Sequence, residues 1–365
     1  MPNYEEKDYL YLIKHHFMNY RDFIENRYFP DMSTSEKAYV IDQMKDDLLP
    51  VITGNTVLTK SYVDNIEIDP GVASEDYLTF TAVESDGATI RLRRVSSAVT
   101  VTRPIEYRVS NTSGVFPNSW TDLVYNEYDY IQVDDGSGGT MTSTYKAEIS
   151  DATNVTISSG QSVQYRNKNA NKYGVFNENT TTKAFRFYIT SGKVLCDGNI
   201  MSLVDKNCTQ SVVRQYAFYA LFYGCTNLLT PPRMPATTLA IGCYYQTFQG
   251  CSNLRYCPEL TAKSVIQNCY YQMFYGCTTI TETPKLMAPA TATTCYYRMF
   301  YGCTNLKNVY VNLIDNATGA TNTWLQNVPT AATWGGKFYK NKNNTLTTVN
   351  FSWIPKNWTV YATLE

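Results

Sequence analysis

The apolar residues near the start of the chain recur at helical spacing. Between residues 4 and 28 an apolar side chain returns every three or four positions, which is the period of one face of an α-helix. Phe29-Pro30 ends this run, and a second helix is expected from the capping-box pair Ser33 and Glu36 to Leu48 or Leu49. The stripe on the first helix consists of Tyr9, Ile13, Phe17, Tyr20 and Ile24. Two short helices with one stripe need a partner, so we interpret residues 1–75 as a helical attachment or oligomerisation segment. The alternative is a helical hairpin packed on its own chain.

The pattern changes to alternation between residues 76 and 208. Apolar and polar positions alternate around Leu78 and Phe80, around Ile90 and Leu92, and in two later segments at 105–109 and 185–189. Breaks rich in turn-forming residues separate these segments, the clearest being the Gly-rich run Asp134–Thr140. The pattern predicts an antiparallel β-sandwich over residues 76–208, with 126–160 as a decorated loop or an extra hairpin.

From about residue 209 the chain repeats itself every 26 residues. Phenylalanine recurs at this interval at Phe222, Phe248, Phe274 and Phe300, and cysteine at Cys225, Cys251, Cys277 and Cys303. A short fixed period indicates stacked supersecondary units, so we predict a solenoid at 209–335 and a C-terminal cap at 336–365. Within one unit, Cys269, Met273, Phe274 and Cys277 have the spacing of one face of a two-turn helix. The predicted class is therefore a mixed α/β multidomain protein.

Charge is unevenly distributed along the chain. Residues 1–70 carry a net charge of −6 and residues 209–365 a net charge of +7, which suggests different partners for the two ends. The basic residues are dispersed and no nucleic-acid-binding motif occurs, so no nucleic-acid partner is expected. The N-terminus has no basic stretch followed by an apolar run, and no 18-residue apolar stretch exists, so we expect neither a secretory signal nor membrane insertion.

Ten cysteines could in principle bind a metal or form disulfides. No CxxC motif occurs, and the only histidines, His15 and His16, lie far from the repeats. We therefore expect no metal and no cofactor, and we interpret the repeated cysteines as small buried apolar residues with free thiols. No nucleophile elbow, histidine-based site or phosphate loop is present, and Asp134 and Asp135 lie in a Gly-rich turn. An enzyme is therefore not expected.

The 31 tyrosines include a regular series within the repeats. Pairs four residues apart recur from unit to unit, so stacking of the units aligns them as an aromatic strip near the surface. The members of this strip are Tyr219, Tyr223, Tyr245, Tyr271, Tyr275, Tyr297 and Tyr301. One interpretation is a binding surface for a sugar or a protein. The other is that the rings merely pack between the repeats. The Asp134–Thr140 loop is a second candidate contact region.

The repeat blocks also carry a family resemblance. CYYQMFYGCTTI and CYYRMFYGCTNL resemble the core of BspA-like leucine-rich repeats, over residues 217–306. Together with the segments 191–203 and 336–360, they resemble repeat proteins encoded by Bacteroidales bacteria and by their phages, including crAss-like phages. This resemblance implies adhesion or surface recognition rather than catalysis.

Two functional hypotheses follow from these features. In the first, the protein is a phage virion structural protein, a head or tail fibre or appendage, that attaches to other virion proteins through residues 1–75. Its solenoid then faces a host-surface glycan or protein, and the protein is expected to be a homodimer or homotrimer. In the second, it is a bacterial cell-surface adhesin of the BspA-like type.

Overall fold

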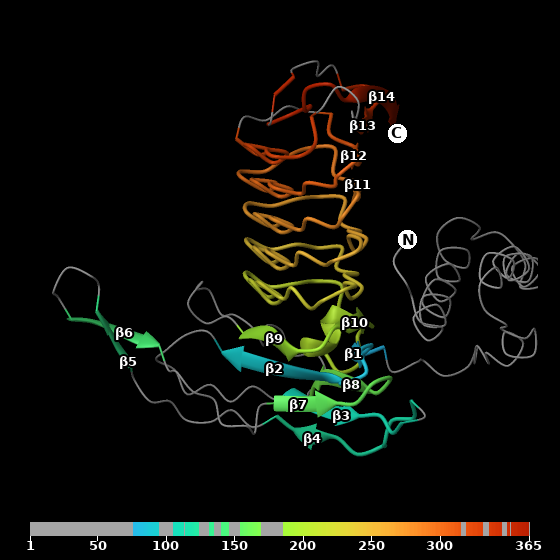
Figure 1. The fold of residues 1–365 in the computed structure, drawn as a ribbon. Helices are drawn as coiled ribbons and strands as arrows, with labels where there is room; N and C mark the ends of the chain where they lie inside the picture. The colour runs from blue at the N-terminus through green and yellow to red at the C-terminus, as the bar shows by residue number, and fades with distance from the viewer. Residues whose placement is uncertain are drawn as a thin grey trace, which may run out of the picture. The chain divides into compact units, whose positions relative to one another are not determined.

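A computed structural model of the chain describes residues 76–94, 105–112, 114–123, 131–134, 140–145, 154–168, 185–314, 319–330, 336–344, 349–350 and 352–364. All of these belong to one compact unit, Glu75–Glu365 (Figure 1). The helical attachment segment predicted for residues 1–75, with its stripe from Tyr9 to Ile24, lies outside the described residues.

Antiparallel sheets make up the first half of the described chain (Figure 1). A five-stranded sheet contains, in spatial order, β10 (Val194–Asp197), β1 (Leu78–Ala82), β8 (Ser162–Asn167), β3 (Ile105–Val109) and β4 (Thr121–Asp122). A three-stranded sheet contains β7 (Asn154–Ile157), β2 (Ala88–Arg94) and β9 (Phe185–Ser191). The strands β5 (Ile131–Asp134) and β6 (Thr140–Tyr145) pair as a hairpin. The strands that alternation predicted are therefore present.

The two larger sheets pack face to face through aromatic side chains. Phe80 of β1 lies 5.0 Å from Phe187 of β9 between ring centroids, and Tyr165 of β8 lies 5.2 Å from the same ring. All three side chains are buried. Alternation along β1 sends Leu78, Phe80 and Ala82 to this interior, as the period of two requires.

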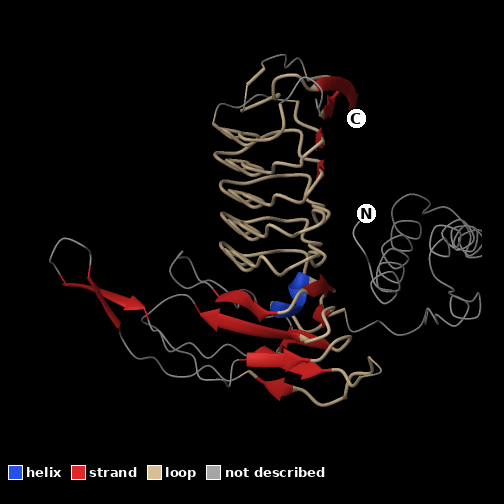
Figure 2. Ribbon diagram, viewed as in Figure 1, coloured by secondary structure: helices blue, strands red, loops and turns tan. Residues whose placement is uncertain are grey.

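The repeats form coils that contain little regular secondary structure (Figure 2). One side of each coil is a nine-residue run of consecutive turns, which we call the turn ribbon. Its first, fifth and ninth residues have positive φ, for example 59° at Gly242, 55° at Gln246 and 76° at Gly250. The five aligned turn ribbons are residues 216–224, 242–250, 268–276, 294–302 and 319–327.

Hydrogen bonds in a turn ribbon alternate between two directions. The N–H groups of Tyr245, Thr247 and Gln249 donate to carbonyls three residues earlier in the same coil. The intervening N–H groups donate to the next coil, as Tyr244 does to the Cys269 carbonyl at 3.0 Å and Gln246 to the Tyr271 carbonyl at 2.8 Å. An α-helix would need bonds four residues back and negative φ throughout. The predicted two-turn helix is therefore wrong.

The opposite side of the later coils forms a parallel sheet. Its strands, in order along the chain and in space, are β11 (Glu282–Leu286), β12 (Asn308–Val311), β13 (Lys337–Asn341) and β14 (Thr359–Leu364). In the earlier coils the same side is held by isolated parallel bridges, such as Met234 with Leu260. A short 3₁₀ helix, η3 (Ile200–Leu203), precedes the first coil, and the Asn199 side chain caps it by accepting from the Met201 N–H.

The mixed α/β class expected from the sequence is contradicted. Among the described residues no α-helix occurs, and the structure consists almost entirely of strands and stacked turns (Figure 2). The buried residues form one continuous cluster from Leu78 in β1 to Trp358 before β14. The boundaries expected at residues 208 and 335 remain a prediction.

Candidate binding surface

The turn ribbon fixes the direction of every side chain on its side of the coil. A step of four residues returns to the same orientation, so Cys243 and Thr247 both point inward and are buried, as is Cys251 directly after the ribbon. The fourth and eighth positions point outward. These two positions hold all seven members of the tyrosine strip: Tyr219, Tyr223, Tyr245, Tyr271, Tyr275, Tyr297 and Tyr301. Gln249 occupies the eighth position in the second ribbon, and Asn322 and Gln326 occupy both positions in the fifth.

The tyrosines of the strip form two stacked columns. In the first, the ring centroids are 5.1 Å apart for Tyr219 and Tyr245, 4.3 Å for Tyr245 and Tyr271, and 4.7 Å for Tyr271 and Tyr297. In the second, Tyr275 and Tyr301 stack at 4.7 Å with nearly parallel planes. The structure thus brings these predicted residues together on successive coils.

Most of the strip tyrosines are half-buried, and Tyr223 is 37% exposed. Stacked neighbours cover the faces of the rings inside each column, so the strip presents ring edges and hydroxyl groups. Burial raises the pKa of Tyr219 and, more strongly, that of Tyr245, where the Tyr271 hydroxyl adds to the effect. These hydroxyls therefore stay neutral around pH 7 and can both donate and accept hydrogen bonds.

A polar column separates the two tyrosine columns. The sequence patterns described above did not predict it. It occupies the fifth position of the ribbon with Gln246, Gln272 and Arg298. The Gln246 amide Nε2 donates to Gln272 Oε1 at 2.7 Å. The Arg298 guanidinium lies 5.2 Å from the ring centroid of Tyr297 and 5.5 Å from that of Tyr301. The 26-residue period could have predicted this column, because Gln246, Gln272 and Arg298 are 26 residues apart.

The repeated cysteines lie inside the coils. The Cys251 thiol donates to the Phe222 carbonyl at 3.0 Å, and the Cys277 thiol donates to the Phe248 carbonyl at 3.1 Å, each reaching back to the preceding coil. Burial raises the pKa of Cys225 and of Cys243 to about 12. All ten cysteines are free thiols, and no cluster of three or more metal-ligating side chains occurs among the described residues.

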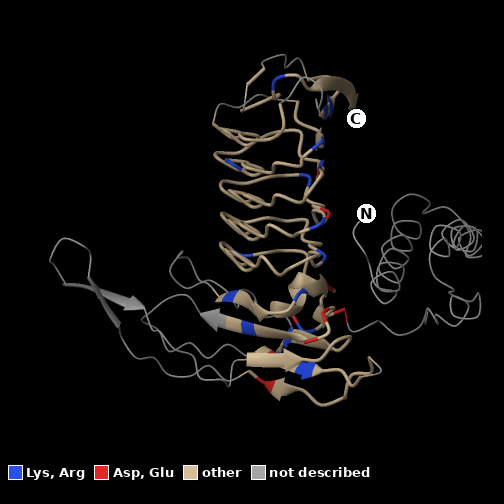
Figure 3. Cartoon of the chain, in the orientation of Figure 1, with Lys and Arg blue, Asp and Glu red and all other residues tan. Residues whose placement is uncertain are grey.

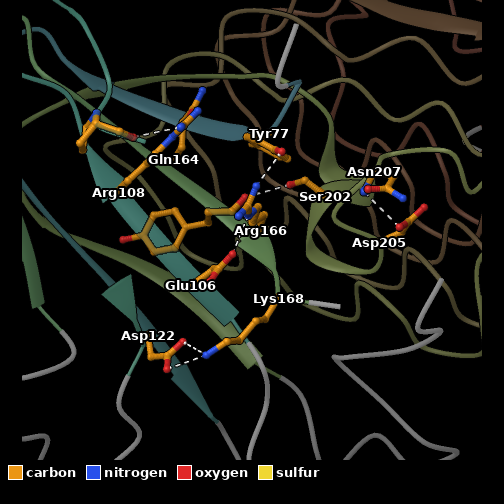
Figure 4. A network of polar contacts seen from close by, with 12 residues as sticks. Tyr77, Glu106, Arg108, Asp122, Gln164, Arg166, Lys168, Ser202, Asp205 and Asn207 are labelled. Atoms are coloured by element: carbon orange, nitrogen blue, oxygen red, sulfur yellow. Dashed lines mark hydrogen bonds and ion pairs between the residues drawn. The ribbon is translucent and has the colours of Figure 1, made fainter. Parts of the chain in front are cut away.

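A second cluster of polar and aromatic residues lies on the five-stranded sheet (Figure 4). The Arg166 Nε atom is 2.6 Å from Glu106 Oε1, and its guanidinium lies 3.8 Å from the Trp120 ring centroid. Arg108 packs against the same ring at 4.4 Å and donates from Nε to Gln164 Oε1 at 2.9 Å. Desolvation, followed by repulsion from Arg166, lowers the pKa of Arg108. Since its groups bind one another, we interpret this cluster as structural.

The stripe Tyr9, Ile13, Phe17, Tyr20 and Ile24 lies outside the described residues, and so does the loop 135–139 between β5 and β6. Within the part of the chain that is described, no helix is long and apolar enough to cross a membrane.

Most charged side chains on the solenoid are basic (Figure 3). Glu259 and Glu282 are the acidic side chains in the described part of residues 209–364. Two charged side chains of the described residues contact rings of the strip: Arg298 in the polar column, and Arg186 of β9, whose guanidinium lies 4.8 Å from the Tyr223 ring centroid. Apart from these two cations, the strip offers uncharged hydroxyl and amide groups.

Comparisons with known proteins agree with the repeat geometry. The family described as the BspA type Leucine rich repeat region matches residues 212–324 in six copies. No curated protein and no solved structure matches the chain. The match supports neither a phage nor a Bacteroidales origin. What it shows is that residues 212–324 of this protein are a BspA-type leucine-rich repeat region.

Proposed function

We propose that this protein is a non-catalytic surface adhesin that binds its ligand through the tyrosine strip. The observation that carries the proposal is the recurrence of the same outward tyrosines on successive coils of a BspA-type repeat region. Repeats of this type are typically adhesion or binding domains without catalytic activity. Because the strip repeats from coil to coil, it favours an extended ligand that contacts several coils at once.

The chemistry of the strip favours a glycan as that ligand. The ring faces inside the columns are covered, so a sugar contacts ring edges, phenolic hydroxyls and the amides of Gln246 and Gln272. Neutral hydroxyls and amides match the hydroxyl groups of a sugar chain, since each can donate and accept. A protein ligand is the alternative outcome of the binding test.

The virion location predicted from the sequence remains a prediction. Its anchor, residues 1–75, lies outside the described residues, and the repeat match supports recognition without supporting a phage particle. The same holds for attachment to other virion proteins and for the expected dimer or trimer.

The test removes hydroxyl groups and keeps the rings. Within the described residues, neither the Tyr275 nor the Tyr301 hydroxyl forms a hydrogen bond, so the double substitution Tyr275→Phe and Tyr301→Phe should leave the stack intact. We expect it to weaken binding of the fluorescently labelled protein to bacterial cells by about tenfold, as the loss of two ligand hydrogen bonds implies. Flow cytometry over a concentration series on a panel of bacterial strains measures this affinity.

The matched control uses the tyrosines of the parallel sheet. Tyr310 and Tyr339 stack at the same 4.7 Å on β12 and β13, so Tyr310→Phe with Tyr339→Phe should leave cell binding unchanged. Equal binding by both double variants would refute the strip as the binding surface. Pretreating the cells with periodate, which cleaves sugar diols, or with a protease then separates a glycan ligand from a protein ligand.

A further inference from the structure

The last strand of the parallel sheet has an open edge. β14 (Thr359–Leu364) follows β13 at the end of the strand order, and no described strand pairs with its other side (Figure 1). Five of its residues are exposed and the sixth is half-buried. Its sequence TVYATL contains no charge, proline or glycine, and Val360 and Tyr361 are 40% and 36% exposed. Such an edge is a template for pairing with another strand.

Both edges of the five-stranded sheet are protected. β4 at the far edge of the five-stranded sheet has two residues, and its Asp122 forms an ion pair with Lys168 at 2.7 Å. β10 at the opposite edge continues into the first coil, where the Val194 N–H donates to the Asn227 carbonyl at 3.0 Å. Short strands, charges and covering segments are the usual means of blocking edges. β14 has none of these among the described residues.

The features of β14 fit a second copy of the same strand. When two identical strands pair antiparallel about a two-fold axis, only the residue on the axis faces its own counterpart, and a charged residue next to it lies diagonally across from its copy, so a charged strand would repel itself. β14 carries no charge, so this pairing brings no repulsion. With Tyr361 on the axis, the pairing would also continue the tyrosine stack of Tyr310, Tyr339 and Tyr361, whose centroids are 4.7 and 5.0 Å apart.

The other end of the solenoid excludes head-to-tail stacking. The first coil is already hydrogen bonded to the antiparallel sheets, since the Phe187 N–H donates to the Leu221 carbonyl at 2.7 Å and the Leu229 N–H to the Val194 carbonyl at 2.9 Å. A second solenoid therefore has no free edge to continue at that end. Pairing through β14 closes at two chains and does not grow into a filament.

We propose that two copies of this protein associate through antiparallel pairing of their β14 strands. The dimer joins the C-terminal ends of two solenoids. It also links two tyrosine strips, which strengthens attachment to a ligand that both strips reach. This last consequence rests on the proposed function, whereas the dimer itself does not.

Light scattering after size-exclusion chromatography of the full chain tests the dimer. We expect the unmodified protein to have twice the chain mass of 41.5 kDa. With Tyr361 on the axis, Val360→Lys places two like charges on diagonal positions of the strand pair and inserts a charge into its apolar centre, so its mass should fall to that of one chain. Val115→Lys is the matched control, because Val115 is 62% exposed in a loop far along the chain from β14, and it should leave the dimer unchanged.

Two results would overturn the proposal. One is an unmodified protein that stays at 41.5 kDa up to high concentration, and the other is a Val360→Lys variant that remains dimeric and therefore associates through another segment. Hydrogen exchange of the unmodified protein is a second measurement that does not depend on how the variant folds. The β14 amides should exchange at least tenfold more slowly at a concentration that gives dimer than at one that gives monomer, and equal rates would also reject the pairing.

Discussion

At the scale of single residues, the coils are held together by columns of like side chains. Phe222, Phe248, Phe274 and Phe300 stack with centroids 5.2 to 5.5 Å apart and almost parallel rings. Beside them, Cys251, Cys277 and Cys303 each donate the thiol to a phenylalanine carbonyl of the preceding coil, and Cys225 donates to the Phe187 carbonyl of β9. Cysteine suits this place because it is small and apolar yet carries a weak donor. The sequence predicted the column and its burial, but not the thiol hydrogen bond.

A third buried column, formed by Phe218, Tyr244, Tyr270 and Tyr296, contains a hydroxyl without a partner among the described residues. The Tyr244 hydroxyl is buried and has no hydrogen-bond partner among the described residues, while the aligned residue of the preceding coil is Phe218, stacked on the Tyr244 ring at 5.6 Å. Tyr244→Phe keeps the ring and removes the unsatisfied group, so it should raise the free energy of unfolding by about 1 kcal/mol. Urea denaturation followed by circular dichroism measures the change. A lower stability than that of the unmodified protein would mean that the hydroxyl has a partner after all.

At the scale of elements, the sequence predicted the strands and the period but not the turn ribbon. Strands such as β1 have an alternation that no other element produces. The spacing of Cys269, Met273 and Cys277 is four residues, which fits both a helix with 3.6 residues per turn and a ribbon with a period of four. What decides between them is the positive φ at Asn268 and Gln272. Asparagine adopts positive φ more often than most residues, but glutamine does not, so the sequence did not reveal the ribbon.

Position 272 separates the ribbon from a helix experimentally. Gln272 has a φ of 51°, a conformation that costs a residue with a Cβ about 1–2 kcal/mol and costs glycine nothing. Gln272→Gly and Gln272→Ala both lose the amide bond to Gln246, so their difference reports the backbone alone. We expect the glycine variant to be the more stable by about 1 kcal/mol in urea denaturation. A helix would give the opposite order, because alanine is favoured over glycine there by about the same amount.

At the scale of the whole molecule, the phenylalanine column extends beyond the repeats. Phe187 of β9 stacks on Phe222 of the first coil at 5.6 Å, and Phe80 of β1 approaches the same ring at 6.2 Å. The antiparallel sheets therefore close the start of the solenoid core. This contact joins residues far apart in sequence and belongs to no repeat, so no periodicity could predict it. The tyrosine strip, in contrast, follows from the period, and its place on the ribbon required the structure.

The continuous core makes stability depend on keeping its acids neutral. The pKa of Cys225 and Cys243 is raised by burial from 9.0 to about 12, and burial also raises the pKa of Cys251 and Cys303 well above 9.0. Above pH 9 the unfolded chain loses thiol protons that the folded chain retains. The folded state then binds more protons, so the free energy of unfolding falls as pH rises.

We therefore expect the urea midpoint to be steady from pH 7 to 8.5 and to fall steeply between pH 9 and 12. Each such thiol contributes a slope of about 1.4 kcal/mol per pH unit within that window. Cys251→Val keeps an apolar side chain at this buried position and removes one titrating group. The stability of the variant should therefore fall less steeply with pH. At neutral pH the variant should be less stable than the unmodified protein, because it lacks the hydrogen bond to the Phe222 carbonyl. Identical slopes for the variant and the unmodified protein would show that the Cys251 thiol does not control alkaline unfolding. A midpoint that stays constant to pH 11 would contradict the buried, neutral state of the whole cysteine column.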